Sequence, residues 1–166
     1  MSFFIISDGK NIKKFGTAQD HKRAGEGDKG LNTGGMGAYS PSRLENDSLD
    51  KKILDKIIKP TLQALKELNT NFKGFLYAGL MIINDEPFLI EYNVRMGDPE
   101  CQTILPRLKT NFFEIIEATV NKKLDQINLE WFNSKALSIV VCSKGYPEKF
   151  EKDKEINNLD KIILKR

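Results

Sequence analysis

The sequence predicts an α+β fold in which helices pack on a mostly antiparallel sheet. Two pairs of short apolar segments, within residues 2–15 and 74–93, are each interrupted by turn-forming residues, which is typical of β-hairpins. Residues 48–68 carry apolar side chains every three to four positions, which predicts an amphipathic helix. With 166 residues, the chain is long enough for one sizeable core and too short for two comfortable domains.

The composition argues against several classes of function. The net charge of +3 is mild and no five like charges follow one another, so binding of nucleic acid through charge alone is not expected. No stretch approaches the roughly 18 apolar residues of a membrane span, and no signal peptide is recognisable, so we expect a cytoplasmic protein without a membrane partner. Cys101 and Cys142 form no C-x-x-C pair, which argues against a zinc site or a disulfide framework.

The first half of the chain supplies both hairpins and the helix. In residues 2–15, "SFFII" and "NIKKF" flank the turn sequence "SDGK". The helix follows capping candidates at residues 46–48, and we expect a bend at Pro60, because proline cannot donate the hydrogen bond of a helix interior. "GFLYAGLMII" (residues 74–83) and "FLIEYN" (residues 88–93) are predicted to pair across the turn sequence "NDEP".

The second half carries weaker signals. Residues 99–108 and 111–122 have helical spacing, and the continuous apolar run at residues 136–143 predicts a buried strand. The tail from residue 148 onward is charged and weakly periodic, and its last apolar run, "IIL", stops almost at the terminus. We therefore expect that the chain is truncated at its C-terminal end.

Half of the glycines lie in one segment, "GEGDKGLNTGGMGAYSP", residues 25–41, which holds six of the 12. Charged and polar residues are interleaved with these glycines and with the preceding "AQDHKRA", so the composition differs from that of a simple linker. Two interpretations stay open: a mobile loop that covers a ligand, or a backbone that binds phosphate or carboxylate. His21 by itself is most often a hydrogen-bonded structural histidine.

The segment "FLIEYNVRMGDPE" carries a candidate metal site. Alternate residues of a strand share a face, so Glu91 and Asn93 are expected to point the same way, and Arg95 joins them if the strand continues. Carboxylate and carboxamide oxygens are hard ligands of the kind that Mg²⁺ prefers, and a guanidinium suits a phosphate or acyl phosphate beside the metal. The alternative is a surface strand end with a simple Glu–Arg pair.

Four segments together resemble one enzyme family. "SFFIISDGKNI", "AQDHKRAGEGDKGLNTGGMGAYSP", "GFLYAGLMI" and "IEYNVRMGDPE" are similar to the second half of the ATP-grasp region of phosphoribosylamine–glycine ligases, also called glycinamide ribonucleotide synthetases. The later "ALSIVVCSKGYPE" resembles the start of the C-terminal domain of that family. The resemblance implies an incomplete ATP-grasp domain at residues 1–123 and the beginning of a C-terminal domain at residues 124–166.

The family's reaction gives these residues expected roles. Its members join glycine to 5-phosphoribosylamine in purine biosynthesis, with ATP as co-substrate and a glycyl phosphate as intermediate. The resemblance implies that Glu91 and Asn93 bind Mg²⁺ or Mn²⁺ and that Arg95 is catalytic, stabilising the transferring phosphoryl group. Substrate-binding residues are expected in the glycine segment and in the "GDPE" turn: Asp20, His21, Lys22, Gly34, Gly35, Gly97, Asp98 and Pro99.

Two departures from the family limit what is expected of this chain alone. Met96 stands where many members carry Phe, a volume-conserving change. The family's contacts to adenine and triphosphate lie in a preceding half, so we expect the chain to be inactive without that N-terminal half as a partner. Two alternatives remain: another ATP-grasp carboxylate–amine ligase, or a non-catalytic binding module.

Overall fold

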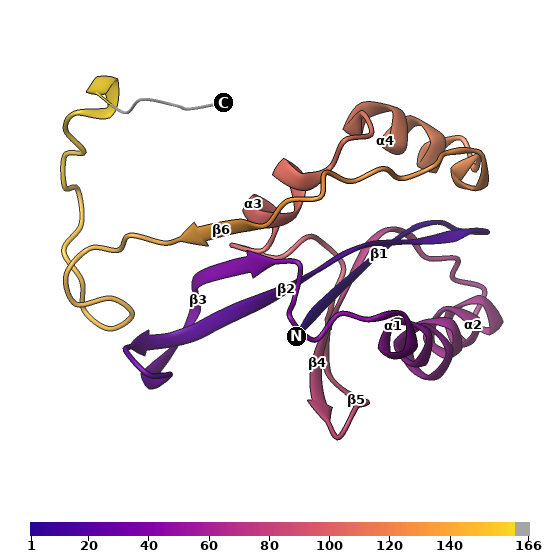
Figure 1. Ribbon diagram of the computed structural model, residues 1–166, viewed down its shortest axis with the longest axis horizontal. Helices are drawn as coiled ribbons and strands as arrows, with labels where there is room; N and C mark the ends of the chain where they lie inside the picture. The colour runs from indigo at the N-terminus through magenta and orange to yellow at the C-terminus, as the bar shows by residue number, and fades with distance from the viewer. Residues whose placement is uncertain (162–166) are drawn as a thin grey trace.

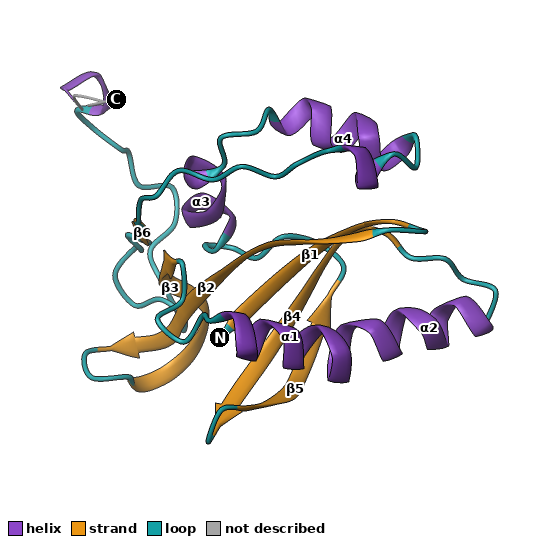
Figure 2. Ribbon diagram, turned by 45° about the vertical axis from the view of Figure 1, so that its right-hand side comes forward, coloured by secondary structure: helices purple, strands orange, loops and turns teal. Residues whose placement is uncertain are grey.

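The computed structural model describes residues 1–161, which form one six-stranded sheet with helices on both faces (Figures 1 and 2). The strand order is β5-β4-β1-β2-β3-β6, and every neighbouring pair is antiparallel. The strands are β1 (Ser2–Asp8), β2 (Ile12–Gly25), β3 (Lys29–Ser40), β4 (Lys73–Ile83), β5 (Glu86–Asn93) and β6 (Ala136–Ile139). The predicted α+β class and antiparallel sheet are confirmed.

Both predicted hairpins are present, and their turns have clear local causes. At the end of β1, the Asp8 carboxylate accepts the backbone N–H groups of Lys10 and Asn11 at 2.8 and 2.6 Å. Burial opposes ionisation of Asp8, but these bonds outweigh it and lower its pKa to about 2. Between β4 and β5, Asn84 and Asp85 have φ of 50° and 60°, the left-handed conformation that a two-residue hairpin turn requires.

The predicted amphipathic helix covers one face of the sheet (Figure 2). It consists of α1 (Asp47–Ile53), a π-helical segment (Leu54–Ile58) and α2 (Lys59–Glu67), and the Asn46 side chain caps it by accepting the Leu49 N–H at 2.9 Å. A bend was expected at Pro60; the structure has a π-helical segment that ends at Ile58, and Pro60 lies in the first turn of α2, where proline is tolerated. The helix packs on a core that includes Phe3, Ile5, Leu49, Ile53 and Ile58.

Shorter helices cover the opposite face (Figure 2). They are α3 (Cys101–Ile104), α4 (Phe112–Val120) and the 3₁₀ segments Leu105–Arg107 and Leu124–Gln126, which confirms helical structure within the predicted ranges 99–108 and 111–122. Their core includes Phe4, Phe15, Ile104, Ile115 and Leu124. Trp131 packs edge-on against Phe15, with ring centroids 5.4 Å apart, so the chain beyond residue 123 shares this core.

Two expectations about secondary structure were wrong. Residues 25–41 are not a loop: β2 continues to Gly25, β3 begins at Lys29, and most of the glycine segment is extended because its backbone groups pair across the hairpin. The strand expected at residues 136–143 is shorter and is not buried. β6 lies at the sheet edge and pairs only with β3, so Leu137 and Ile139 are 69% and 73% exposed. The apolar run "IIL" lies outside the described residues.

Candidate functional site

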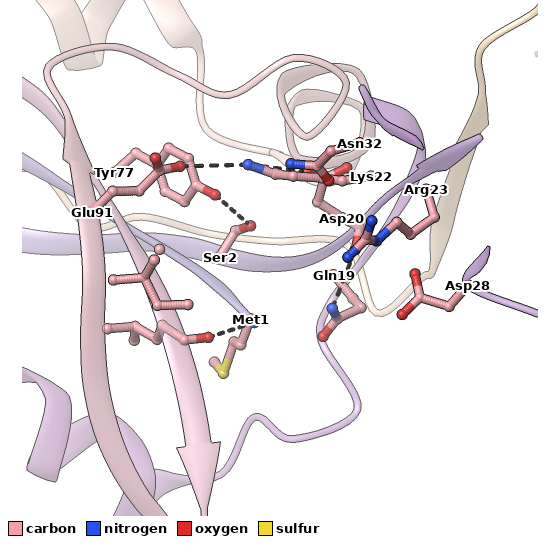
Figure 3. Close-up of a pocket in the computed structure, with 13 residues that line it drawn as sticks. Met1, Ser2, Gln19, Asp20, Lys22, Arg23, Asp28, Asn32, Tyr77 and Glu91 are labelled. Atoms are coloured by element: carbon pink, nitrogen blue, oxygen red, sulfur yellow. Dashed lines mark hydrogen bonds and ion pairs between the residues drawn. The ribbon is translucent and has the colours of Figure 1, made fainter. Parts of the chain in front are cut away.

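A polar cleft separates the end of β5 from the β2–β3 hairpin (Figure 3). It consists of two adjoining pockets of about 390 and 240 Å³, which share Asp20, Lys22, Tyr77 and Glu91. The Lys22 ammonium of the hairpin reaches across to Glu91 of β5, with Nζ 3.4 Å from Oε1. The hairpin and β5 therefore form opposite walls that meet at this ion pair.

The candidate metal ligands lie in one wall, as predicted. Glu91 and Asn93 line the smaller pocket together, and Asn93 Nδ2 is 3.5 Å from Glu91 Oε1. Opposite them, Gly79 of β4 leaves room for the carboxylate, because a Cβ there would come within 3.0 Å of Glu91 Cγ. Strict alternation fails at Ile90, the extra residue of a β-bulge, which lines the larger pocket together with Glu91 instead of facing away from it.

The donor set of this wall fits a hard divalent cation that brings other ligands with it. One carboxylate and one carboxamide are available, and a rotation of the Asn93 amide turns its oxygen toward the carboxylate. Within residues 1–161, no group of three or more His, Cys, Asp or Glu side chains is arranged to hold a metal. A cation bound here therefore needs phosphate and water oxygens to complete its coordination, which is the usual arrangement for Mg²⁺.

The opposite wall contains a buried carboxylate. The Asp20 side chain is only 7% exposed, its Oδ2 lies 3.7 Å from Lys22 Nζ, and its Oδ1 has no hydrogen-bond partner among the described residues. Burial, and the negative charge of Glu100, raise the pKa of Asp20 to about 6 against the opposing effect of Lys22. Glu100 is itself buried and accepts a hydrogen bond from the Ser2 hydroxyl at 2.8 Å. This wall can therefore hold or release a proton near neutral pH.

The glycine segment contributes an unpaired stretch of β3 to the cleft. Strand pairing jumps from Arg23↔Asn32 to His21↔Gly37, so residues 33–36 of β3 face only Lys22 of β2. We call residues 33–36 the glycine bulge. Thr33 shapes it, because its hydroxyl donates to the Lys22 carbonyl at 2.8 Å and accepts the Gly35 N–H at 3.1 Å. Gly34 faces the smaller pocket from this bulge.

Close packing requires glycine at one position of the bulge, Gly35, and at one position of the "GDPE" turn, Gly97. Gly35 has φ of 134°, and a Cβ there would come within 2.5 Å of Pro99 Cδ. Gly97 has a similar constraint, because a Cβ would come within 2.2 Å of Glu100 Oε2. Gly35 therefore lets the glycine bulge contact the "GDPE" turn directly, and Gly97 leaves room within that turn for the Glu100 carboxylate.

Most of the site residues expected from the sequence meet in the smaller pocket. Its lining includes eight of them: Asp20, Lys22, Gly34, Glu91, Asn93, Arg95, Gly97 and Asp98. Gly35 and Pro99 lie directly behind it, in contact with each other. His21 lies elsewhere, because its neighbours Asp20 and Lys22 take the side of β2 that faces the cleft; its ring packs 5.8 Å from that of Tyr39.

Several residues of the cleft were not singled out from the sequence, among them Ser2, Thr33, Tyr77 and Glu100. Ser2 and Tyr77 lie within apolar strand sequences, where they read as core. Thr33 and Glu100 lie inside the two recognised motifs, so the motifs themselves were the available signal. The Tyr77 ring is buried and its hydroxyl is 3.3 Å from that of Ser2; burial and the nearby carboxylates raise its pKa to about 12, so the phenol stays neutral.

A third pocket, of about 610 Å³, continues the cleft beyond Arg95. Gly34, Arg95 and Asp98 line both this pocket and the smaller one. Its far side is formed by Val140, Cys142 and Tyr146, from the chain after β6. Arg95 is thus accessible from two directions, and its Nη1 donates to the Met96 carbonyl at 2.9 Å.

Known proteins resemble this chain over nearly its whole length. Residues 1–101 match the family model described as "Phosphoribosylglycinamide synthetase, ATP-grasp (A) domain". Phosphoribosylamine–glycine ligases from Brucella melitensis and Caldanaerobacter subterraneus are 45% and 47% identical to it; each comparison covers 97% of this chain. The crystal structure of the Thermotoga maritima phosphoribosylamine–glycine ligase superposes with a TM-score of 0.82, at 31% identity over 91% of this chain.

The chain matches only part of the length of each relative. The chain spans 38% of the Brucella protein, 39% of the Caldanaerobacter protein and 38% of the Thermotoga structure. No helix among residues 1–161 is both long enough and apolar enough to cross a membrane. Cys101 and Cys142 are free cysteines.

Proposed function

Since the chain belongs to the phosphoribosylglycinamide synthetase ATP-grasp (A) domain family, we propose that it forms the metal-binding part of a site that joins glycine to 5-phosphoribosylamine. The observation that carries this proposal is the convergence of Glu91, Asn93 and Arg95 with the glycine bulge in one pocket. Phosphoryl transfer to a small carboxylate requires oxygen ligands for a metal ion, a positively charged side chain beside the transferred group, and backbone that the substrate can approach closely. Glu91 with Asn93, Arg95 and the glycine bulge would supply these in turn.

Glu91 and Asn93 would hold the cation, Mg²⁺ or Mn²⁺. Ligases with the ATP-grasp fold use ATP together with divalent metal ions. Bound here, the ion would neutralise charge on the ATP phosphates and so favour attack on the γ-phosphorus. Lys22 Nζ lies 3.4 Å from Glu91 Oε1, and this ion pair orients the carboxylate toward the cleft. Arg95 then supplies a permanent positive charge for the transferred phosphoryl group.

The substrates would meet between the two walls. An oxygen of the glycine carboxylate attacks the γ-phosphorus of ATP, and ADP leaves. The amine of 5-phosphoribosylamine then attacks the carbonyl carbon of glycyl phosphate, the C–O bond to phosphate breaks, and the amine loses a proton. Gly34 has no side chain and so lets a small substrate come close to the backbone in this pocket, and the unpartnered Asp20 Oδ1 would accept a hydrogen bond or proton from an ammonium or amine.

The proposal also includes the cellular compartment and the division of the chain into domains. The two free thiols fit the reducing conditions of the cytoplasm, where we place the protein. We also keep the division into an ATP-grasp part, residues 1–123, and the beginning of a second domain, residues 124–166. The end of the family match at residue 101 leaves that boundary open to test by limited proteolysis.

Phosphate release tests the function directly. The chain is combined, fused or in trans, with the portion of the Brucella relative that it does not span, and is given ATP and Mg²⁺. We expect phosphate release that requires both glycine and 5-phosphoribosylamine, and no release by the chain alone. Release that is supported equally by other amino acids or other amines would contradict the assigned substrates.

A further inference from the structure

Two hydrogen bonds join the glycine bulge to the chain after β6. The Val140 N–H donates to the Met36 carbonyl at 2.9 Å. The backbone N–H of Gly34 donates to the Tyr146 hydroxyl at 3.4 Å, across 112 residues of sequence. Neither neighbouring strand offers Gly34 a partner in the described chain, because the β2–β3 pairing omits residues 33–36 and the β3–β6 pairing begins at Gly37. The Tyr146 hydroxyl is therefore the protein partner of a solvent-exposed donor that the sheet leaves free.

Tyr146 is itself held in place by a tight turn. Gly145 has φ of 99°, and a Cβ there would come within 2.3 Å of the Lys149 carbonyl oxygen. The Tyr146 N–H donates to the Ser143 carbonyl at 3.2 Å, and the ring packs edge-on against Phe150 with centroids 5.8 Å apart. The hydroxyl is thus presented toward Gly34 by a backbone conformation that favours glycine at position 145.

The contact lies beside the reactive part of the cleft. Gly34 lines the smaller pocket with Arg95 and Asp98, and Tyr146 lines the third pocket with the same three residues. A shift of Gly34 therefore changes the shape of the space next to Arg95. Since Gly34 has no side chain, its position depends on its backbone contacts.

We propose that Tyr146 is a positioning residue, which fixes the glycine bulge at Gly34 and thereby shapes the substrate pocket beside Arg95 from the far end of the chain. Its effect on the bulge follows from the contacts above; its effect on turnover rests on the proposed function. The chain after β6 thus completes the cleft instead of only packing behind it.

The first test measures the contact without any assay of activity. In the full chain, Tyr146→Phe removes the hydroxyl and keeps the ring. Tyr39→Phe is the matched control, because its hydroxyl accepts from Arg43 Nε at 3.1 Å and does not contact Gly34. We expect amide hydrogen exchange at Gly34, followed by NMR, to become about fivefold faster in Tyr146→Phe only, as the loss of one hydrogen bond implies. Equal Gly34 exchange in wild type and Tyr146→Phe would overturn the proposal.

The second test uses the assembled protein, in which the chain is combined with the portion of a relative that it does not span. We expect Tyr146→Phe to lower kcat/KM for glycine or 5-phosphoribosylamine about tenfold while KM for ATP stays unchanged. Wild-type turnover in Tyr146→Phe, despite faster Gly34 exchange, would refute the effect on the pocket. An inactive wild-type assembly would instead count against the proposed function, and the exchange result would still decide whether Tyr146 holds the bulge.

Discussion

At the scale of single residues, Glu91 has the most specific assignment. Its carboxylate lines the cleft, whereas Glu86 on the same strand pairs with Lys52 and Lys56 at 2.7 and 2.5 Å outside it. In the assembled protein with ATP, we expect Glu91→Gln to weaken Mn²⁺ binding at least tenfold, because a neutral amide is a poorer ligand than a carboxylate. Glu86→Gln is the control and should leave binding unchanged. Electron paramagnetic resonance of free Mn²⁺ measures both affinities, and equal losses in the two variants would contradict the assignment.

Asp20 gives a prediction about pH and stability. Its pKa is about 6 in the folded protein and 3.8 in the unfolded chain, so between these values the folded state binds more protons. The free energy of unfolding therefore falls as pH rises from about 4 to 6, and the penalty persists at pH 7. We expect Asp20→Asn to be more stable than wild type by about 2 kcal/mol at pH 7 and by nearly nothing below pH 4. Urea unfolding at both pH values measures this, and a difference that does not depend on pH would refute it.

At the scale of elements, two glycines of the β2–β3 hairpin separate the contributions of close packing and of backbone conformation to the stability of the fold. Gly35 and Gly27 both have positive φ, 134° and 68°, but only Gly35 has a close neighbour, Pro99. Gly27→Ala should therefore cost about 1 kcal/mol from strain alone. Gly35→Ala should cost at least about 2 kcal/mol, because it adds a clash to the strain. Thermal unfolding of both variants measures the costs, and equal costs would show that the contact with Pro99 is unimportant.

Elements that depend on neighbouring residues could be predicted from the sequence, whereas elements that depend on distant strand partners could not. The helix around residues 48–68 and the turn at Asn84–Asp85 depend on periodicity and residues close in sequence, and both were recognised. The extended state of β3 depends on partners in β2 and β6, so its glycines looked like a loop. The exposure of β6 likewise follows from its place at the sheet edge, which apolar composition does not encode.

The residues of the cleft were also predicted only in part. Alternation along β5 correctly placed Glu91 beside Asn93, because a strand has a fixed period, but the bulge at Ile90 was not foreseen. His21 was expected with Asp20 and Lys22 because all three belong to one motif. In a strand, alternate residues face opposite sides, and His21 lies against Tyr39 instead of in the pocket.

At the scale of the whole molecule, one sheet between two layers of helices holds the cleft open at one end. The two cores lie on opposite faces of the sheet and include buried residues of β1, β4 and the first part of β2. The walls come from segments as far apart as Asp20 and Tyr146, and the larger relatives contribute further chain that this one does not span. The proposed chemistry thus depends on long-range contacts as well as on local motifs.

We propose that, in the assembled protein, this cleft makes an acyl phosphate from glycine before any amine reacts. Positional isotope exchange in ATP labelled at the β–γ bridge, with glycine present and 5-phosphoribosylamine absent, measures that step in the assembled protein. We expect exchange that requires glycine and is abolished by Glu91→Gln but not by Glu86→Gln. Exchange that appears only when the amine is added, or that persists unchanged in Glu91→Gln, would contradict the claim.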